Sequence, residues 1–271
     1  MILEGNLRKM TTWLEEQACY ALPLHDILEP MTPLPMNELI GREVAITFNG
    51  KINCVVSGKQ IKKAFGEGMA YDVWQKSPLA VESIIRPELS RIHEGIALRD
   101  KEWEEKYHNR PHYVYLSRTS GIKVGVTSTG NVPSRWIDQG AVEALVIAET
   151  PYRQMAGLIE VRLAKEIPDK TLWRDMLTGK TGDGNPLTEA RDKLFEYLEE
   201  DARPFLRNAE ETVKIMYPLL KTPEKVTAIK LDSVQQISGK LIGIKGQYLL
   251  FESGLVINIR SHSGYRVSIE Y

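Results

Sequence analysis

The alternation of apolar and polar positions is clearest from residue 111 to residue 163. Two short runs, residues 112–116 and 122–126, alternate in this way, and the five residues between them are polar or small. A period of two is typical of half-buried strands, and a short polar and glycine-containing connection is typical of a turn. The two runs therefore predict a β hairpin.

A helix, a strand and a second helix are predicted after this hairpin. Ser134 is suited to a helix N-cap and Gly140 to a helix stop, which predicts a short helix over residues 135–139. Residues 141–149 are apolar and partly β-branched and predict a third strand. After Pro151, apolar residues recur at the spacing of one helical face, at Tyr152, Met155, Ala156, Ile159 and Leu163.

This order of elements, with these residues in it, resembles the GIY-YIG nuclease superfamily. Members carry Gly-Ile-Tyr on a first strand, Tyr-Ile-Gly on a second strand, an Arg on the first helix and a Glu on a later helix. Here Tyr113-Val114-Tyr115 stands at the first motif and Lys123-Val124-Gly125 at the second, and Arg135 and Glu160 take the helical positions. The chain departs from the pattern at Lys123, which stands in place of the second motif's Tyr, and in its shorter hairpin loop.

The resemblance implies a role for each matched residue. Glu160 would hold a divalent cation, Mg or Mn, Arg135 would clamp the phosphate, and Tyr115 or Tyr113 would orient or deprotonate the attacking water. Lys123 would either lower the pKa of a tyrosine or bind a phosphate without any reaction. Read from the residues alone, Arg135 could instead pair with Asp138 or Glu160, and the tyrosines could be ordinary strand residues. Candidates of a second rank are His112, Gln139 and Arg153.

A second resemblance, to an uncharacterised bacterial family, covers nearly the whole chain. It is carried by GNLRKM near Gly5, by the run KVGVT through RWIDQGA, and by GQYLLF near Gly246. The resemblance implies a zinc ribbon that has lost its ligands, because paired cysteines of the family match Cys54 and then Ser57, Ala70 and Val73. A structural zinc site needs about four Cys or His ligands, so no zinc is expected.

The chain is predicted to be α+β, with a small central GIY-YIG-like sheet and flanking helices. An N-terminal β module is expected over residues 1–50, a zinc-ribbon-like segment over 51–110 and the core over 111–180. Asn49-Gly50 predicts a turn between strands at 44–48 and 52–56. A helix capped by Asp169 is expected over 170–178, a helical segment over 187–221, and a barrel-like β module over 226–271.

Composition and charge place few limits on function. The 271 residues are 42% hydrophobic and 26% charged, with a net charge of −1, so any attraction to DNA or RNA must be local. Residues 51–63 hold four lysines and no acid. Near the C-terminus, basic residues lie among aromatic ones that would suit stacking on nucleic acid or fill a barrel: Lys240, Lys245, Tyr248, Phe251, Arg260, Tyr265 and Arg266.

No membrane partner is expected, because the sequence has no apolar run of membrane-spanning length and the first ten residues do not form a signal peptide. A cytoplasmic location is expected, with Cys19 and Cys54 as free thiols.

Three functions follow from these observations. The first is a nucleic-acid-binding protein on a GIY-YIG-like scaffold with reduced or no catalysis, which would use Lys123, Arg135, Arg153, Lys240 and Lys245. The second is a metal-dependent nuclease. The third is a protein-interaction module, which the near-neutral charge leaves open.

Overall fold

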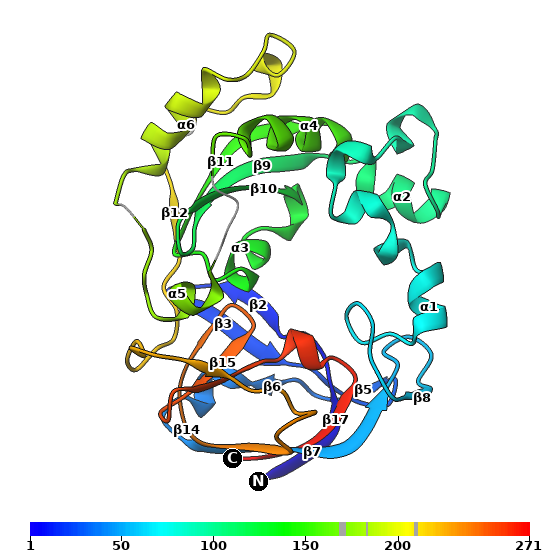
Figure 1. The fold of residues 1–271 in the computed structure, drawn as a ribbon, viewed down its shortest axis with the longest axis vertical. Coiled ribbons are helices and arrows are strands. Elements are labelled where there is room, and N and C mark those ends of the chain that lie inside the picture. The colour runs from blue at the N-terminus through cyan, green and yellow to red at the C-terminus, as the bar shows by residue number, and fades with distance from the viewer. Residues whose placement is uncertain (168–171, 183, 209–210) are drawn as a thin grey trace. The chain divides into compact units, whose positions relative to one another are not determined.

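The computed structural model describes all residues except 168–171, 183 and 209–210 (Figure 1). The chain divides into two compact units. Unit 1 contains Met1–Ser77, Ile137–Gly140 and Met216–Tyr271, and unit 2 contains Pro78–Trp136 and Ala141–Ile215. Both units contain strands and helices, which confirms the mixed α+β class.

Unit 1 is built on one large sheet that joins the two ends of the chain. Its strands follow the order β13-β16-β15-β14-β7-β17-β1-β4-β5, and β8 pairs with β7. The pairing of β1 with β17 is antiparallel and sets Ile2 opposite Glu270. The strands are β1 Ile2–Leu7, β4 Leu24–Asp26, β5 Glu29–Pro30, β7 Glu43–Asn53, β8 Gln60–Ile61, β13 Thr227–Ala228, β14 Gln236–Lys245, β15 Tyr248–Phe251, β16 Leu255–Asn258 and β17 Tyr265–Glu270. The modules expected at residues 1–50 and 226–271 are therefore parts of one structure.

The hairpin predicted at Asn49-Gly50 does not form. β7 continues through both residues, because its first half pairs with β14 on one side and most of its length pairs with β17 on the other. The ladder to β17 changes register between Phe48 and Ile52, where Gly50 has a φ of +75°. The extra residues of β7 thus form a β bulge. Like the predicted turn, a bulge can contain a glycine with a positive φ.

Smaller elements complete unit 1. A second sheet has the order β2-β3-β6. Its strands are Thr11–Leu14, Ala18–Leu22 and Leu34–Pro35, and the helices of the unit are α1 Tyr71–Lys76 and the 3-10 turns η1 Met36–Leu39 and η8 Arg260–His262.

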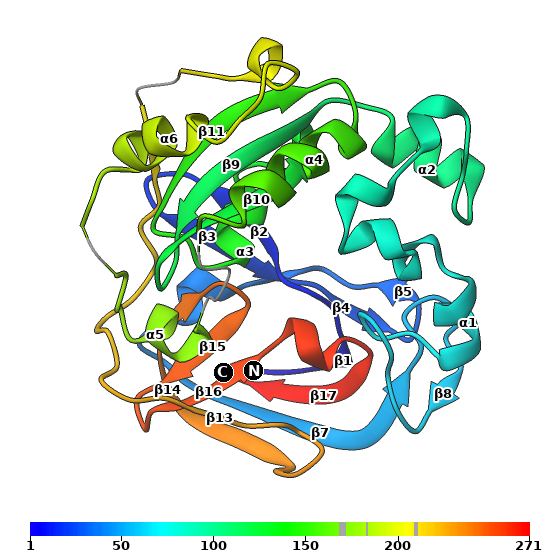
Figure 2. The ribbon, with the colours of Figure 1, turned by 45° about the horizontal axis from the view of Figure 1, so that its top comes forward.

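Unit 2 has a four-stranded antiparallel sheet of order β10-β9-β11-β12. It contains the predicted hairpin, β9 His112–Arg118 and β10 Ile122–Ser128, then helix α3 Ser134–Asp138, whose last two residues are counted in unit 1, strand β11 Glu143–Thr150 and helix α4 Arg153–Leu163. The order of elements predicted from the sequence is thus confirmed. Buried residues of α4 and of α6, Leu187–Phe195, share one apolar core with the sheet (Figure 2).

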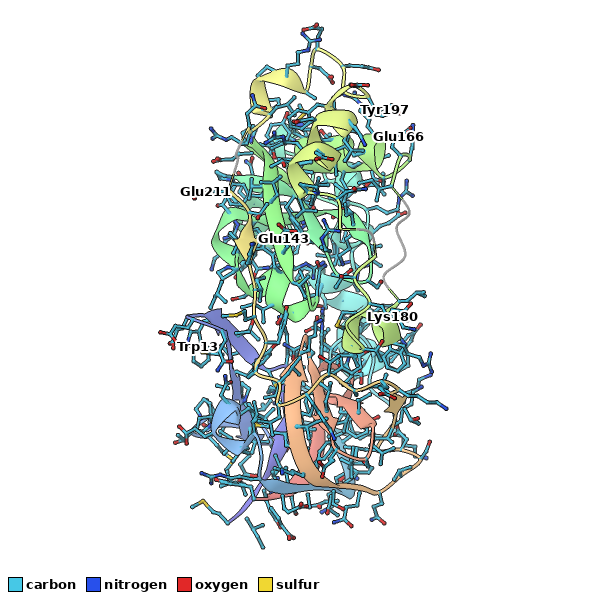
Figure 3. The ribbon with its side chains drawn as sticks, turned by 90° about the vertical axis from the view of Figure 1, so that its left-hand side faces the viewer. Trp13, Glu143, Glu166, Lys180, Tyr197 and Glu211 are labelled. Atoms are coloured by element: carbon cyan, nitrogen blue, oxygen red, sulfur yellow. The ribbon has the colours of Figure 1, made fainter. Side chains whose placement is uncertain are left out.

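The chain between α4 and the end of unit 2 is less helical than predicted. After α6 and the 3-10 turn η7, Arg203–Phe205, residues Val213–Lys214 form β12 and pair with Glu143 and Ala144 at the start of β11 (Figure 3). The predicted helix at 170–178 is α5, Trp173–Leu177, and its expected cap Asp169 lies outside the described residues.

The segment before β9 consists of short helical turns and α2. Their bounds are η2 Pro78–Ala80, η3 Glu82–Ile84, η4 Pro87–Leu89, η5 Ile92–Glu94 and α2 Lys101–His108, and η6, Thr129–Asn131, follows β10. Within the described ranges, no helix has the length and apolar character needed to cross a membrane.

Candidate functional site

The hairpin of unit 2 presents Tyr113, Tyr115 and Lys123 on one face of the sheet. Across the two strands, Lys123 lies opposite Ser117 and Tyr115 lies opposite Gly125. Successive side chains of a strand point to opposite faces, so these residues share the face that does not pack on α4 and α6. The face toward those helices is apolar and includes Val114, Leu116 and Val124.

Tyr115 is fully buried on this face. A Cβ added at Gly125 would lie 2.7 Å from the Tyr115 hydroxyl oxygen, so the tyrosine lies directly across the glycine backbone. Its ring also meets Trp136 edge to face, with 5.9 Å between ring centroids. Gly125 therefore accommodates the ring of Tyr115, and Tyr115 packs inside the unit. Tyr113 is only partly buried.

Arg153, at the start of α4, is an internal connection of unit 2. Its guanidinium donates to the carbonyls of Ser83 at 3.0 Å and Ile84 at 2.9 Å. Burial lowers the pKa of Arg153 to about 10. These contacts use the arginine to hold the turns before β9 against α4, which leaves it poorly placed to contact a large polyanion.

Arg135 and Glu160 both act electrostatically on Arg153. After burial, which has the largest effect, the carboxylate of Glu160 raises the pKa of Arg153 and the guanidinium of Arg135 lowers it. The two helical positions of the resemblance therefore share one electrostatic neighbourhood. Arg135 and Glu160 are each partly exposed.

Around Glu160 the described residues offer a divalent cation a single carboxylate. Among the described residues, no three His, Cys, Asp or Glu side chains are grouped as metal ligands. Glu160 would have to bind the ion through a single carboxylate close to the positive charge of Arg153, which repels a cation. The residues in this place suit an anion better than Mg or Mn.

His112, a candidate of the second rank, and His108 are both buried beside Arg153. Burial, reinforced by the charge of Arg153, lowers the pKa of His108 to about 3 and that of His112 to about 4. His112 Nδ1 lies 2.7 Å from the carbonyl oxygen of Arg110, which fixes its neutral tautomer with the proton on Nδ1. Both rings are thus neutral groups that pack inside the unit. Their burial sets them apart from exposed histidines, and no local sequence pattern indicates it.

Comparison with known proteins assigns the family but no activity. A family model described as "Protein of unknown function (DUF2797)" matches residues 41–267. The chain belongs to the DUF2797 family. No curated protein and no solved structure matches it.

The match to the DUF2797 model includes the zinc-ribbon-like segment, and there the four expected ligand places lie together. The Cys54 sulfur accepts hydrogen bonds from the backbone N–H groups of Ser57 at 3.4 Å and Ala70 at 3.2 Å. Cys54 and Ala70 are buried in one apolar cluster, against which Val73 packs. Backbone amides directed at a sulfur are what a thiolate ligand would use, and apolar side chains pack around Cys54 here.

The basic residues near the C-terminus differ in exposure. Lys245 is 4% exposed and lies over the Tyr217 ring, and burial lowers its pKa to about 8. Lys240, on β14, is partly exposed and stands opposite Glu43 of β7. Of the aromatic residues that would either stack on bases or fill a barrel, Phe251 and Tyr265 are buried. These aromatics fill the interior of unit 1.

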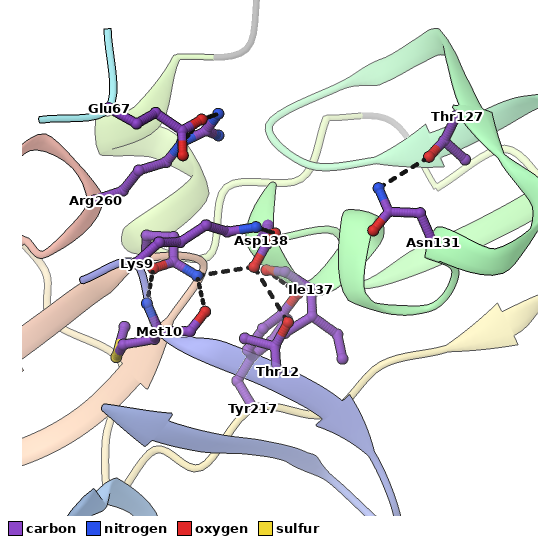
Figure 4. A network of polar contacts seen from close by, with 11 residues as sticks. Lys9, Met10, Thr12, Glu67, Thr127, Asn131, Ile137, Asp138, Tyr217 and Arg260 are labelled. Carbon is purple, nitrogen blue, oxygen red and sulfur yellow. Dashed lines mark hydrogen bonds and ion pairs between the residues drawn. The ribbon is translucent and has the colours of Figure 1, made fainter. Parts of the chain in front are cut away.

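The segment Ile137–Gly140 belongs to unit 1, where Asp138 is the centre of a polar network (Figure 4). Its carboxylate forms an ion pair with Lys9 and accepts hydrogen bonds from Gln247 at 2.8 Å and Thr12 at 3.2 Å. Gln247 in turn exchanges hydrogen bonds with both backbone groups of Met10. The ion-pair partner of Asp138 is thus Lys9, whereas the sequence had suggested Arg135 as a possible partner.

Proposed function

We propose that the protein binds nucleic acid through the hairpin surface of unit 2 and does not cleave it. This hairpin surface consists of Tyr113, Lys123 and Arg135, and Glu160 on α4 shares with Arg135 the electrostatic neighbourhood of Arg153. Support comes from the order of elements, which follows the GIY-YIG arrangement, and from the partial exposure of all four side chains. Lysine and arginine supply the phosphate contacts that dominate affinity for nucleic acid.

The observation that carries the proposal is the packing of Tyr115 across Gly125. The residues matched to the two motifs, Tyr115 and Gly125, lie opposite each other, while the tyrosine hydroxyl is buried. A buried hydroxyl cannot orient a water that attacks a phosphate in solvent. Lys123 stands in the place of the second tyrosine, and a lysine supplies donors for a phosphate in place of a phenolic hydroxyl. The scaffold is therefore better suited to holding a phosphate than to hydrolysing one.

Fluorescence anisotropy with labelled single- and double-stranded DNA and RNA tests the proposal. Lys123→Ala and Arg135→Ala should each weaken binding several-fold at low salt, because each removes one phosphate contact. Lys193→Ala, an exposed lysine on α6 in the same unit, is the matched control and should leave the affinity unchanged. Equal affinities for all four proteins would refute the assignment of this surface.

A further inference from the structure

Unit 1 has an exposed apolar tip made of two neighbouring loops. The first is the two-residue turn Ile27-Leu28 between β4 and β5, and the second is the loop after Cys54 that carries Val56 and Gly58. Ile27, Leu28 and Val56 are 43%, 41% and 58% exposed. A Cβ at Gly58 would lie 3.0 Å from Ile27 and 3.2 Å from Leu28, so the loops are in contact. Figures 1 and 2 both show β5 and β8, which flank these loops, side by side.

The turn of the first loop has a strained backbone at Ile27, and a glycine or asparagine at this position would relieve the strain. Ile27 has a φ of +58° and is the only non-glycine residue with positive φ among those described. Two-residue hairpin turns usually place Asn, Asp or Gly at such positions, and a β-branched residue there is an outlier. Strain of this kind is typical of functional sites, where a side chain is needed at a fixed place.

A buried pair of asparagines holds both loops in place. Asn6 accepts a hydrogen bond from the backbone N–H of Ile27 at 3.2 Å and donates to the side chain of Asn53 at 3.0 Å. Asn53 then donates to the carbonyl of Gly58 at 2.9 Å. One continuous chain of side-chain hydrogen bonds therefore links the two loops through the interior of the unit.

The polar backbone groups of the turn are satisfied from within the protein. Arg8 donates to the carbonyl of Ile27 at 2.8 Å, and His25 Nδ1 lies 3.0 Å from the carbonyl oxygen of Leu28. The tip thus presents apolar side chains, and the carbonyls of its turn have hydrogen-bond partners within the protein in place of water. Such an arrangement suits insertion into a surface from which water is excluded.

The surroundings of the tip are mainly basic. Lys59 follows Gly58 directly, and Lys62 and Lys63 follow β8; all three are exposed. Of the two acids beside the turn, Asp26 forms an ion pair with Arg266 at 2.9 Å, and Glu29 is exposed. The charge therefore complements an anionic partner.

We propose that this tip is a wedge that enters a step of a double-stranded nucleic acid, with the lysines on the flanking phosphates. Aliphatic wedges that unstack a base step are a known mode of duplex binding, and the unstacking must be driven by a side chain that is held in place. A rigid, strained tip suits this ordered acceptor better than a fluid lipid surface, which accepts a flexible loop equally well. This wedge lies in unit 1 and does not rest on the hairpin surface of unit 2.

The test uses a 20-base-pair DNA duplex with 2-aminopurine at a central TA step, whose fluorescence rises on unstacking. The full-length protein should raise the signal, and Ile27→Gly/Leu28→Ser should abolish the rise and weaken duplex binding about tenfold. Glycine favours a positive φ, so this variant keeps the turn. Met216→Ser/Leu220→Ser, which removes two apolar side chains of unit 1 that are 64% and 59% exposed, should behave as the unaltered protein.

Replacing Lys59, Lys62 and Lys63 by Gln should reduce the slope of log affinity against log salt concentration by about 3, because it removes three phosphate contacts. An unaltered fluorescence rise in the Ile27/Leu28 variant, or none in the original protein, would overturn the proposal. Binding to vesicles with 30% phosphatidylglycerol that depends on Ile27 and Leu28, without duplex binding, would overturn it in favour of a lipid partner. Variants of Lys123 and Arg135 should keep the fluorescence rise, which separates failure of the wedge from failure of the hairpin surface.

Discussion

Gly125 and Tyr115 face each other across β9 and β10, and the tyrosine hydroxyl lies where a side chain at position 125 would begin. Gly125→Ala should therefore push the buried ring out of its place and lower the free energy of unfolding of unit 2 by about 1–3 kcal/mol. Chemical denaturation followed by far-UV circular dichroism measures the change.

Gly121→Ala is the matched control, because nothing lies within 4 Å of the position of its added Cβ in the same hairpin. It should change stability by less than about 1 kcal/mol. If Gly125→Ala were as stable as Gly121→Ala, the packing of Tyr115 described above would be wrong.

Strands β9, β10 and β11 and helices α3 and α4 of unit 2 could be predicted because their signals are local. Alternation gives β9 and β10, and the spacing of apolar residues gives α4. The joining of β1 to β17 could not be predicted, because two strands at opposite ends of the chain carry no local sign of their pairing. The Asn-Gly pair in β7 led to a wrong prediction of a hairpin. Its local preference for a turn is strong, but pairing of β7 with strands on both sides outweighs it.

The candidate site was predictable only in part for a related reason. The spacing of Tyr115, Lys123 and Arg135 follows from local elements, but exposure depends on distant packing. Lys245 and Tyr115 look available on alternating strands, yet both are buried. Arg153 looks like a surface cation on a helix, and its bonds to carbonyls some 70 residues earlier in the chain show it to be internal.

Acid should destabilise unit 2 through His108 and His112. Their pKa values are lowered in the folded protein, so between about pH 6.5 and pH 4 the unfolded chain binds more protons and stability falls as pH falls. The contribution is complete above about pH 6.5 and is on the order of 3 kcal/mol for His112. Denaturant unfolding at several pH values measures the slope.

Replacing His112 by Asn keeps a donor for the Arg110 carbonyl and removes the titrating group. The variant should show a smaller loss of stability between pH 7 and pH 4.5, whereas His25→Asn, in unit 1, should leave the slope for unit 2 unchanged. The same slope in all three proteins would exclude His112 as its source.

The network around Asp138 should matter for the stability of unit 1. Asp138 is 4% exposed in its side chain and serves Lys9, Thr12 and Gln247 together. Asp138→Ala should cost about 1–3 kcal/mol, because it leaves the buried donors of Gln247 and Thr12 without their acceptor, whereas the charge of the partly exposed Lys9 is solvated. Glu252→Ala removes the exposed partner of Lys221, 3.6 Å away, and should cost less than about 1 kcal/mol. Similar losses in the two variants, measured by denaturant unfolding, would contradict the central place given to Asp138.

The fold around Cys54 should not depend on zinc. Because Ser57, Ala70 and Val73 stand at the remaining ligand places and pack around the sulfur, elemental analysis of the purified protein should find no stoichiometric zinc, and a chelator should leave the melting temperature unchanged. Alkylation should modify the half-buried Cys19 in the native protein and the buried Cys54 only after unfolding. Zinc that is lost in a Cys54→Ala variant would show that other ligands complete the site.

Cleavage assays on Glu160 separate a binding protein from a nuclease. Glu160 is the only carboxylate that the resemblance offers to a metal, and its neighbour Arg153 is a cation. We therefore expect no cleavage of DNA or RNA above background with Mg or Mn. Glu160→Gln should tighten binding severalfold, because it removes a negative charge from the electrostatic neighbourhood of Arg153 that Glu160 shares with Arg135. Glu166→Gln removes an exposed acid that follows α4 in the sequence. It controls for the loss of one acid and should have a smaller effect.

Clear cleavage by the unaltered protein would establish the nuclease instead if Glu160→Gln reduced it by orders of magnitude and left the circular dichroism spectrum unchanged. Only a metal ligand or a reacting group gives that pattern.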